Sequence, residues 1–443
     1  MRVAPGCPTA RDAWPPPRGV SLARMAGGPA DAMTKTFLFD LDMTLVDTSA
    51  LATLRKTQQW HLVAANMHLV RAFRALPGGV APHEMPAALS MAGHRVGIVT
   101  SSPRPYAEEI TRLFRIPYDV LVCYEDTADH KPDPAPLLEA LSRLGVAAGA
   151  DVHYVGDDVG DVEASYHAGI VSVGVGWSPT SPFEFSSAAP DIFVGRPSTL
   201  LRTDRLGSLP YVGESLAAGR PYYGHWGSIL RCDDGPGVYA LGRYFTTSDP
   251  RHAGSRLSEA VLRLKEDDGP AEALGRALGK AVDRLDWTPD IVVPVPPKPS
   301  QARNRFAALL GVAAQHMPDE VEVERDGLRC TREVEGYKAL GPLERREAVK
   351  GAFESEFTWG RAKILLVDDV YTTGGTTAAC AEALLGDGAS EVRIMALAKD
   401  QRTFARKVCP ACGRTMRVRI SGVGVKFWGC SGYPDACRNT EDL

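Results

Sequence analysis

Short apolar runs alternate with longer amphipathic stretches along the first half of the chain. The apolar runs occupy Phe37–Phe39, Arg95–Thr100, Asp119–Val122, Val152–Val155 and Val171–Val175. Helical periodicity appears between them, as in Pro105–Phe114 and Pro136–Leu144. Strands that alternate with helices of this length predict a parallel sheet covered by helices on both faces. Ligands of such sheets bind at the carboxyl ends of the strands.

A second alternating series follows residues 179–210, a stretch rich in Ser, Pro and Thr that we interpret as a boundary. Its predicted strands are Val238–Phe245, Ile291–Val295, Ile364–Val367 and Val392–Leu397. Helices are expected near Ala271–Leu285 and Gln301–Gln315. The predicted fold class is therefore α/β, with two doubly wound parallel-sheet domains followed by a small cysteine-bearing tail.

Length and composition support this division. At 443 residues, with 44% apolar and 23% charged residues, the chain has room for two or three packed domains. We expect domains at 34–200, 205–400 and 405–443, after a leader at 1–32 that is disordered or spurious, with Met33 as an alternative start. No run of 18 apolar residues occurs and the N-terminus lacks the apolar core of a signal peptide, so neither a membrane span nor secretion is expected.

The net charge of −4 hides an asymmetry. Residues 401–443 hold eight Lys/Arg against three acids, a balance of +5, so the remainder sums to −9. Four of the nine cysteines also lie in this tail. The other five are scattered singly, which favours reduced thiols and a cytoplasmic protein over a disulfide framework.

Polar residues with phosphate chemistry follow the strands of the first series. Asp40 and Asp42 come after the first strand, Thr100 ends the second, and Gly156–Asp161 follows a later one. Lys131 stands before a predicted helix. One carboxylate can attack phosphorus while another protonates the leaving oxygen, further carboxylates hold Mg²⁺, and a hydroxyl with a lysine binds phosphoryl oxygens.

This set resembles the motifs of the haloacid dehalogenase superfamily of phosphatases, DxDxT, a hydroxyl residue, Lys and GDxxxD, in order over residues 36–195. The resemblance implies Asp40 as nucleophile and Asp42 as acid/base, with Thr100 and Lys131 on a phosphorylated small molecule. It implies a Mg²⁺ site of Asp40, Asp42, Asp157 and Asp161. The family commonly has Gly or Asn at the position of Met43, and any cap over the site is small. A degenerate, non-catalytic copy is the alternative.

A second phosphate-type loop follows the apolar run at Ile364–Val367. Asp368 and Asp369 precede a Thr/Gly turn, Thr372, Thr373, Gly374, Gly375 and Thr376, at a predicted helix N-terminus. Such a turn binds anions through backbone N–H groups, and paired acids suit the vicinal hydroxyls of a sugar.

That arrangement resembles the phosphoribosyl diphosphate (PRPP) motif of type I phosphoribosyltransferases. The resemblance implies that the two acids bind ribose hydroxyls and the loop binds the 5′-phosphate, while Lys298 lies in a loop near the pyrophosphate. Residues Leu343–Phe353 resemble a segment of competence protein F (ComF)-like transferases, with Ala348 where those have Asn. A PRPP-binding regulator without transferase activity is the alternative, and transferases of this type often form homodimers.

The tail pairs its cysteines in a pattern typical of a Zn²⁺ site, with ligands Cys409, Cys412, Cys430 and Cys437. The pattern resembles the C-terminal zinc finger of type IA DNA topoisomerases. Aromatic residues beside cations suit single-stranded nucleic acid, which gives the candidate contacts Arg417, Arg419, Lys426, Phe427, Trp428 and Tyr433. Docking on a protein is the alternative role of the finger, and at least one of the aromatic residues is expected in its core.

The function predicted from the sequence is a Mg²⁺-dependent phosphohydrolase joined to a PRPP-using phosphoribosyltransferase, in nucleobase or nucleotide-type metabolism. Two intact motif sets on one chain motivate that prediction. The competing hypothesis is a DNA- or RNA-associated sensor, or a competence or stress protein, whose PRPP site binds ligand without catalysis.

Overall fold

The computed structural model divides the chain into two compact units. The first contains Met1–Thr180, Val194–Leu206 and Phe404–Leu443, and the second contains Ser181–Phe193 and Gly207–Thr403. The structure describes residues 34–75, 79–179, 182–208, 210–232, 237–301, 303–333, 349–404, 408–414, 416–420, 426–430, 432–433 and 436–442. The predicted leader at 1–32 lies outside these residues, as does Leu343–Ala348 of the ComF-like segment.

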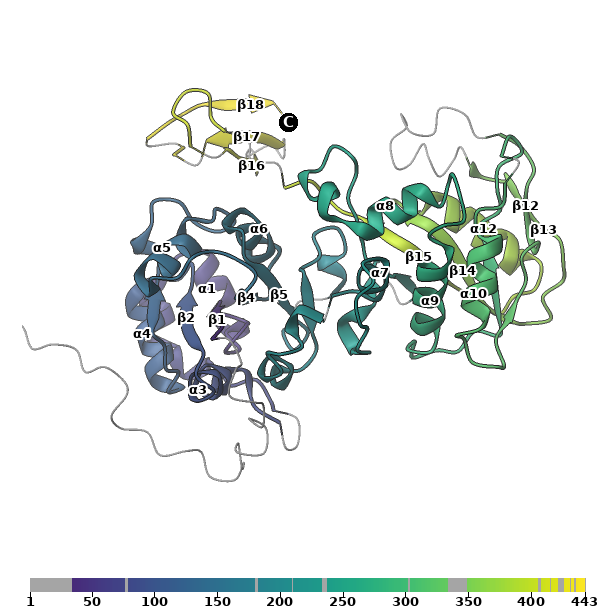
Figure 1. The fold of residues 1–443 in the computed structure, drawn as a ribbon. Helices are drawn as coiled ribbons and strands as arrows, with labels where there is room; N and C mark the ends of the chain where they lie inside the picture. The colour runs from purple at the N-terminus through teal and green to yellow at the C-terminus, as the bar shows by residue number, and fades with distance from the viewer. Residues whose placement is uncertain are drawn as a thin grey trace, which may run out of the picture. The chain divides into compact units, whose positions relative to one another are not determined.

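The first unit is built on five strands of a sheet of order β3-β2-β1-β4-β5-β6, whose last strand, β6, lies at the division between the two units (Figure 1). The strands of this sheet are β1 (Thr36–Phe39), β2 (Arg95–Val99), β3 (Val120–Val122), β4 (Val152–Gly156), β5 (Val171–Val175) and β6 (Ile192–Val194). Strands β1 to β5 pair in parallel, which confirms the predicted α/β sheet of this unit. Phe39 pairs with Ile98 on one side and Val155 on the other, so β1, β2 and β4 end at the same edge.

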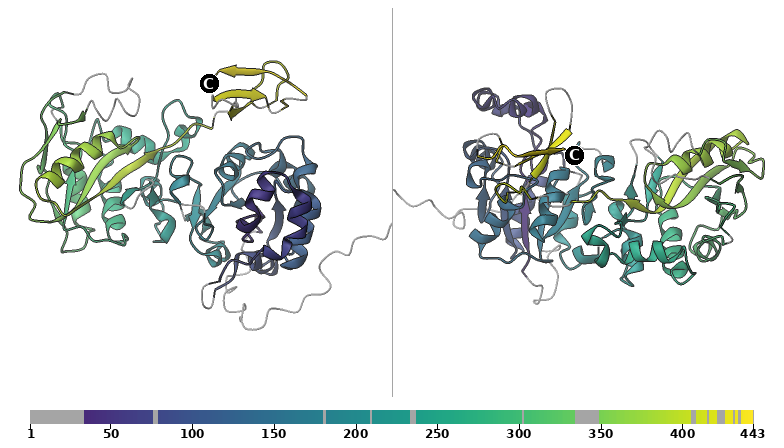
Figure 2. Two further views of the ribbon diagram at one scale, coloured as in Figure 1. Left: turned by 180° about the vertical axis from the view of Figure 1, so that it is seen from behind. Right: turned by 90° about the horizontal axis from the view of Figure 1, so that it is seen from above.

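The helices of this unit connect the strands. They are α1 (Ala52–Lys56), α2 (Trp60–Ala65), α3 (Met85–Met91), α4 (Arg104–Leu113), α5 (Ala135–Leu144) and α6 (Val159–Ala168). The α6 helix begins where the Asp158 carboxylate accepts a hydrogen bond from Gly160 N, and ends at Gly169 with φ 69°, a left-handed cap that favours glycine. Helices α1 and α2 form a small insert between β1 and β2, which projects to one side of the sheet (Figure 2, right).

The second unit contains a larger sheet of order β11-β10-β14-β15-β8-β7, with β9 also pairing β15. Its strands are β7 (Leu230–Arg231), β8 (Val238–Ala240), β9 (Arg243–Tyr244), β10 (Ile291–Pro294), β11 (Glu322–Val323), β14 (Lys363–Tyr371) and β15 (Glu391–Asp400). Its helices are α7 (Val212–Ala217), α8 (Arg256–Arg263), α9 (Ala271–Val282), α10 (Ala307–Ala314) and α12 (Gly375–Gly386). A separate antiparallel pair joins β12 (Leu328–Cys330) to β13 (Phe353–Ser355). Pairing in the large sheet is parallel except at its edge, where β7 runs antiparallel to β8.

Several elements differ from their predicted extents. The expected strand Val238–Phe245 is split into β8 and β9, and between them Gly242 approaches Leu257 and Glu214 too closely for a side chain. The β14 strand continues to Tyr371, beyond the predicted end at Val367, so Asp368 and Asp369 lie within the strand. The boundary stretch contains β6, whose three apolar residues were too few to be recognised as a strand.

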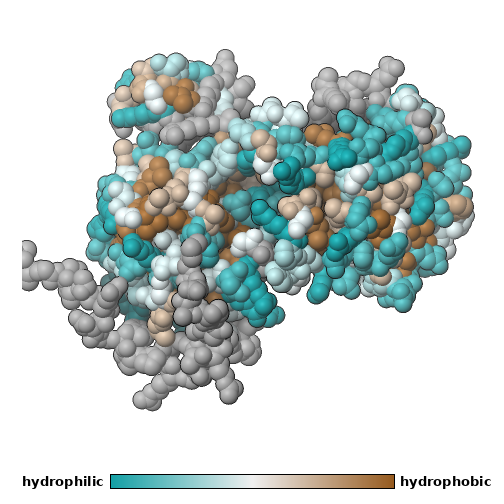
Figure 3. Space-filling model, viewed as in Figure 1, coloured by the Kyte–Doolittle hydropathy of each residue, from teal (hydrophilic) through white to brown (hydrophobic). Residues whose placement is uncertain are grey.

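The cores of the two units are apolar and lie between sheet and helices. In the first unit Phe37, Leu38 and Phe39 are fully buried, and Leu137 and Leu141 of α5 pack in the same cluster as Leu38. In the second unit Leu365 and Val367 of β14 pack with residues of α9 and α10 on one face. The visible face of the molecule interleaves hydrophilic and hydrophobic residues (Figure 3). None of the helices in the described part of the chain combines the length and hydropathy of a bilayer span.

The C-terminal finger consists of three antiparallel strands, β16 (Met416–Ile420), β17 (Lys426–Cys430) and β18 (Thr440–Asp442). Arg419 pairs with Phe427 along the backbone, and Trp428 pairs with both Val418 and Glu441. The side chains of Arg417, Arg419 and Lys426 lie outside the described part of the structure.

Candidate functional site

Three buried carboxylates meet at the carboxyl edge of the first sheet. Asp40 follows β1, Asp157 follows β4, and Asp161 lies in the first turn of α6. One oxygen of each lies within 4.8 Å of the others, and the residues are only 4 to 7% exposed. Oxygen ligands at this spacing suit a hard cation such as Mg²⁺, which would offset the repulsion among three clustered negative charges.

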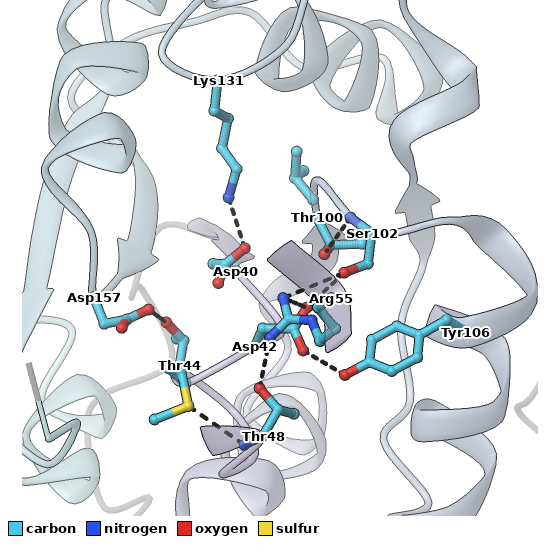
Figure 4. Close-up of polar contacts among 12 residues, drawn as sticks. Asp40, Asp42, Thr44, Thr48, Arg55, Thr100, Ser102, Tyr106, Lys131 and Asp157 are labelled. Carbon is cyan, nitrogen blue, oxygen red and sulfur yellow. Dashed lines mark hydrogen bonds and ion pairs between the residues drawn. The ribbon is translucent and has the colours of Figure 1, made fainter. Parts of the chain in front are cut away.

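Lys131 connects two of these carboxylates. Its Nζ lies 2.6 Å from Asp40 Oδ1 (Figure 4). The same Nζ lies 2.8 Å from Asp161 Oδ1 and donates to the Tyr154 hydroxyl at 2.8 Å. Burial raises the pKa of Asp40 well above its usual range, although Lys131 acts in the opposite direction. Burial alone would lower the pKa of Lys131, but Asp161 and Asp40 outweigh it and raise that pKa. Lys131 therefore stays a cation at the centre of the site.

Asp157 is oriented by two hydroxyl groups. Thr44 Oγ1 donates to Asp157 Oδ1 at 3.0 Å, and Ser178 Oγ donates to Oδ2 at 3.1 Å. Thr44 is itself fixed, because Trp177 Nε1 donates to its carbonyl oxygen at 2.9 Å. These contacts hold the Asp157 carboxylate beside Asp40 and Asp161.

Asp42 lies in a different set of contacts. It accepts hydrogen bonds from Ser102 Oγ at 2.7 Å and from the Tyr106 hydroxyl at 2.6 Å, and Arg55 Nη2 lies 2.7 Å from Oδ2 (Figure 4). The sequence grouped Asp42 with the Mg²⁺ ligands, whereas the carboxylates brought within 4.8 Å of one another are those of Asp40, Asp157 and Asp161. Burial raises the pKa of Tyr106, and Asp42 adds to the effect, so this hydroxyl remains a donor.

The turn between Asp40 and Thr44 explains a feature of the motif. Met43 has φ 64°, in the left-handed region that Gly and Asn tolerate best. Its sulfur accepts a hydrogen bond from Thr48 N at 3.4 Å. The family's Gly or Asn at this position thus matches a backbone requirement, which Met43 meets at a conformational cost.

Thr100 lies beside the site at the end of β2. Its Oγ1 accepts a hydrogen bond from Ser102 N at 3.1 Å, which shapes the loop that presents Ser102 to Asp42. Sequence reasoning assigned no role to Arg55, Ser102, Tyr106, Tyr154, Trp177 or Ser178. Only Ser102 gave a signal, as the last hydroxyl of Thr100-Ser101-Ser102.

A second candidate site lies at the carboxyl end of β14 in the other unit. Lys265 Nζ lies 3.1 Å from Asp369 Oδ2, and Arg305 lies 3.4 Å from Asp369 and 3.8 Å from Asp368. Burial and the neighbouring Asp369 raise the pKa of Asp368. Burial opposes ionisation of Asp369 as well, but Arg305 and Lys265 lower the pKa of that carboxyl below its usual range.

The Thr/Gly turn after β14 leads directly into α12. Gly374 has φ 72°, and a Cβ there would lie 2.4 Å from the Tyr371 hydroxyl, so only glycine fits. A cavity of about 530 Å³ is lined by this turn and by residues of the segment after β10, namely Val295, Pro296, Lys298 and Gln301. The structure brings to it most of the predicted PRPP residues, namely Lys298, Asp368, Asp369, Thr372, Gly374, Gly375 and Thr376. Thr373, the remaining residue of the predicted turn, lies between Thr372 and Gly374 in the chain but does not line the cavity, and its Oγ1 is buried.

The four tail cysteines converge. Their sulfurs lie within 4.8 Å of one another, with Cys409 Sγ 3.8 Å from Cys437 Sγ and Cys412 Sγ 3.4 Å from Cys430 Sγ. Zn–S bonds of about 2.3 Å in a tetrahedron place sulfurs about 3.8 Å apart. The donor set therefore fits Zn²⁺, including the widely spaced pair Cys430 and Cys437.

The aromatic residues of the finger differ in environment. Trp428 packs against the small cluster of Cys409, Met416 and Cys430, so it belongs to the finger's core. Tyr433 is 38% exposed and Phe427 is half-buried. The structure thus leaves Tyr433 and part of Phe427 accessible to a ligand.

Two family models match the chain. The family described as haloacid dehalogenase-like hydrolase matches residues 81–175, and the one described as topoisomerase DNA binding C4 zinc finger matches residues 406–443. With the carboxylate and cysteine clusters, these matches support the Mg²⁺ and Zn²⁺ predicted from the sequence.

The first unit is similar to curated phosphatases. A putative pyrophosphatase PpaX of Caldanaerobacter subterraneus subsp. tengcongensis is 39% identical over 114 residues, which are 25% of this chain and 51% of the relative. A phosphoglycolate phosphatase of Xylella fastidiosa is 37% identical over 123 residues, 26% of this chain and 52% of the relative. The chain thus spans about half the length of the first relatives it matches. A solved structure of a putative haloacid dehalogenase-like hydrolase from Bacteroides fragilis aligns with 22% identity and a TM-score of 0.32, over 38% of this chain and 100% of that one.

One relative is covered over most of its length. The N-acetylmuramic acid 6-phosphate phosphatase of Pseudomonas aeruginosa is 30% identical over 182 residues, which are 40% of this chain and 74% of the relative. The matched length, together with the family model and the carboxylate cluster around Lys131, leads to one assignment. The chain belongs to the haloacid dehalogenase-like hydrolases.

Proposed function

We propose that the first unit is a Mg²⁺-dependent phosphatase that works through an aspartyl-phosphate. The observation that carries the proposal is the Lys131 ammonium held between Asp40 and Asp161, with Asp157 beside them. This arrangement places a nucleophilic carboxylate, a cation for phosphoryl oxygens and oxygen ligands for Mg²⁺ within one buried cluster.

The proposed reaction has two displacements. Asp40 attacks phosphorus, the bond from phosphorus to the leaving oxygen breaks, and Asp42 gives that oxygen its proton. Water then attacks the aspartyl-phosphate, Asp42 takes back a proton, and inorganic phosphate leaves from Asp40. Lys131 and Thr100 bind the phosphoryl oxygens through both steps. Mg²⁺, when bound by Asp40, Asp157 and Asp161, reduces the charge repulsion between the nucleophile and the phosphate.

The experiment that tests the proposal is release of inorganic phosphate by the full chain. A panel of phosphomonoesters and pyrophosphate is incubated with and without Mg²⁺, and initial rates are compared. Hydrolysis that needs Mg²⁺ supports the proposal. Absence of hydrolysis of every member of a broad panel contradicts it.

Gly156 provides a prediction about the geometry of this cluster. A Cβ at Gly156 would lie 2.2 Å from Asp161 Oδ2, so Gly156→Ala must displace the carboxylate that contacts Lys131. We expect phosphate release to fall roughly 10- to 100-fold, because catalytic groups tolerate little misplacement. Initial rates at saturating Mg²⁺ provide the measurement. Gly149→Ala is the matched control, since a Cβ at Gly149 would have no atom within 4 Å; equal rates for both variants would contradict the prediction.

For the second unit we propose PRPP binding at the cavity beside β14. The support is the placement of the paired acids and the Thr/Gly turn around one cavity of about 530 Å³. Asp368 and Asp369 would bind the ribose hydroxyls, and the backbone N–H groups at the start of α12 would bind the 5′-phosphate. A nitrogen nucleophile would then displace pyrophosphate at the anomeric carbon. Incubation with Mg²⁺, PRPP and candidate bases tests transfer; PRPP binding without pyrophosphate release would favour the sensor.

Asp369→Asn tests the ribose site directly. Arg305 and Lys265 lie beside the Asp369 carboxylate and favour its charged form, and charged acceptors form the stronger hydrogen bonds to hydroxyls. We expect the dissociation constant for PRPP, measured by titration calorimetry with Mg²⁺, to rise about 10- to 100-fold. Asp326→Asn, at an exposed position of the same unit, should leave it unchanged. Equal affinities for both variants would contradict the assignment of the paired acids to the PRPP site.

We further propose that the finger contacts single-stranded nucleic acid. The family match, the surplus of basic residues in the tail and the accessible Tyr433 support this role. Lys/Arg contacts with phosphates release counterions, so the affinity should fall steeply with salt. Salt-insensitive binding, or none, would favour docking on a protein.

A further inference from the structure

A cavity of about 370 Å³ lies beside Asp42 in the first unit. Part of its wall comes from the insert, through Arg55, Lys56, Gln58 and Trp60. The rest comes from loops after β2 and β3, including Ser102, the residue that donates to Asp42. Two lining residues, Arg55 and Ser102, contact the acid/base carboxylate of Asp42, and the lining starts at Ser101, the residue after the phosphate-binding candidate Thr100.

The wall of this cavity carries cations without carboxylates. Arg55 and Lys56 both line it, and none of its lining residues is Asp or Glu. Arg55 uses Nη1 on Thr48 Oγ1 at 2.8 Å and Nη2 on Asp42 at 2.7 Å. Its Nε is buried and has no hydrogen-bond partner among the described residues. An arginine and a lysine on one wall favour an anionic ligand, because hydrogen bonds between charged groups are the stronger ones.

The insert is shaped to present these cations. Gln58 has φ 55°, a left-handed conformation that is unfavourable for a residue with a side chain, and its N–H donates to the Arg55 carbonyl at 3.0 Å. The Arg55 guanidinium lies 5.6 Å from the centre of the Tyr106 ring, and the Trp60 ring lies 5.8 Å from the same ring. Backbone strain of this kind clusters at ligand-binding segments. The turn at Gln58 therefore fixes Arg55 and Trp60 on one side of the cavity.

We propose that this cavity binds an anionic leaving group, so that the preferred substrates are small phosphate esters or anhydrides with a second negative charge beyond the reacting phosphorus. The proposal rests on the phosphatase function above, in which Asp42 protonates the leaving oxygen and the rest of the leaving group lies beyond Asp42. Arg55 and Lys56 bind the carboxylate or phosphate of that group. Because Arg55 touches Asp42 as well, one guanidinium couples recognition of the leaving group to the acid/base residue.

A matched pair of substrates isolates the second charge. The leaving group of 2-phosphoglycolate is a two-carbon chain that ends in a carboxylate. The leaving group of 2-hydroxyethyl phosphate is a two-carbon chain that ends in a neutral hydroxyl. We expect kcat/KM to be at least about 10-fold higher for the anionic ester. Lys56→Gln should reduce that ratio about 5-fold, as expected for an exposed charge, and Arg55→Gln roughly 10-fold or more. Pyrophosphate in a third arm shows whether the cavity prefers a phosphate to a carboxylate.

Arg112→Gln is the control, because Arg112 is an exposed cation on α4 that pairs with Glu109 and does not line the cavity. It should leave the ratio unchanged. The inference is overturned if the ratio is near one in the unmodified protein, or if neither cavity variant changes it. Hydrolysis of either ester in the same assay would still support the proposed phosphatase function. Binding to Asp40→Asn by calorimetry provides a readout that needs no turnover: equal affinity for the two esters also overturns it.

Discussion

Replacing Asp40 by Asn is expected to abolish phosphate release by the first unit, with a loss of roughly 10³- to 10⁴-fold in kcat. The amide cannot form the aspartyl-phosphate, and it removes one of the two carboxylates that hold Lys131. Initial rates with pyrophosphate or 2-phosphoglycolate at saturating Mg²⁺ provide the measurement.

The same substitution should not unfold the protein. Asp40 is buried beside Asp157 and Asp161, and burial disfavours its charged form, so a neutral amide of similar shape relieves part of this cost. Thermal melting should therefore show equal or higher stability for Asp40→Asn. Asp151→Asn is the matched control: Asp151 is half-exposed, pairs with Lys35 before β4, and should keep full activity. If Asp40→Asn retained more than about a tenth of the rate, Asp40 would not be the nucleophile.

The central part of this site could be predicted from the sequence for a simple geometric reason. Asp40, Thr100 and Asp157 each follow a short buried strand, and parallel pairing of β1 with β2 and β4 aligns those strand ends. Once the apolar runs are recognised, the register requires the polar residues after them to meet. The metal-type cluster of Asp40, Asp157 and Asp161 follows from that alignment.

The residues around Asp42 could not be found in this way. Arg55 comes from the insert, whose position over the sheet depends on packing that no local pattern encodes. Tyr106 lies on α4 among residues with the ordinary periodicity of a core-facing helix. Tyr154 belongs to the apolar run of β4, where a tyrosine suggests the core until its hydroxyl is seen bonded to Lys131 and Val99. Such side chains gain a role only when tertiary packing brings their polar ends together.

The point at which β14 ends also determines how the two acids of the second site are held. The apolar run at Ile364–Val367 predicted a strand that ends before the two acids, but β14 continues through them, since β15 pairs with it as far as Tyr371 and Lys399. A rigid strand thus holds Asp368 and Asp369, and the turn begins only at Thr372. Charged residues inside a strand are poorly predicted because their cost is offset by partners, here Arg305 and Lys265, that are distant in sequence.

Removal of zinc is expected to unfold the finger while both α/β units stay folded. Among the described residues, its buried cluster contains only Cys409, Met416 and Cys430, with Trp428 and Cys437 packed against it. So small a core cannot offset the entropy of ordering the strands, and metal binding contributes apparent free energies of about 10–16 kcal/mol in comparable fingers. Chelation, or Cys430→Ser, should release the zinc and expose β17 amides to hydrogen exchange. Affinity for single-stranded DNA should fall at least about 10-fold with it.

Cys330→Ser is the control for this prediction, because Cys330 is a free cysteine of the second unit that does not belong to the four-sulfur cluster. Its zinc content and β17 protection should match those of the unmodified chain, and its phosphate release should be unchanged. Zinc retained by Cys430→Ser at full stoichiometry would show that the four sulfurs, 3.4 and 3.8 Å apart in pairs, are not the ligand set. Protection of β17 that survives chelation would instead show that its antiparallel pairing with β16 and β18 stabilises the finger without metal.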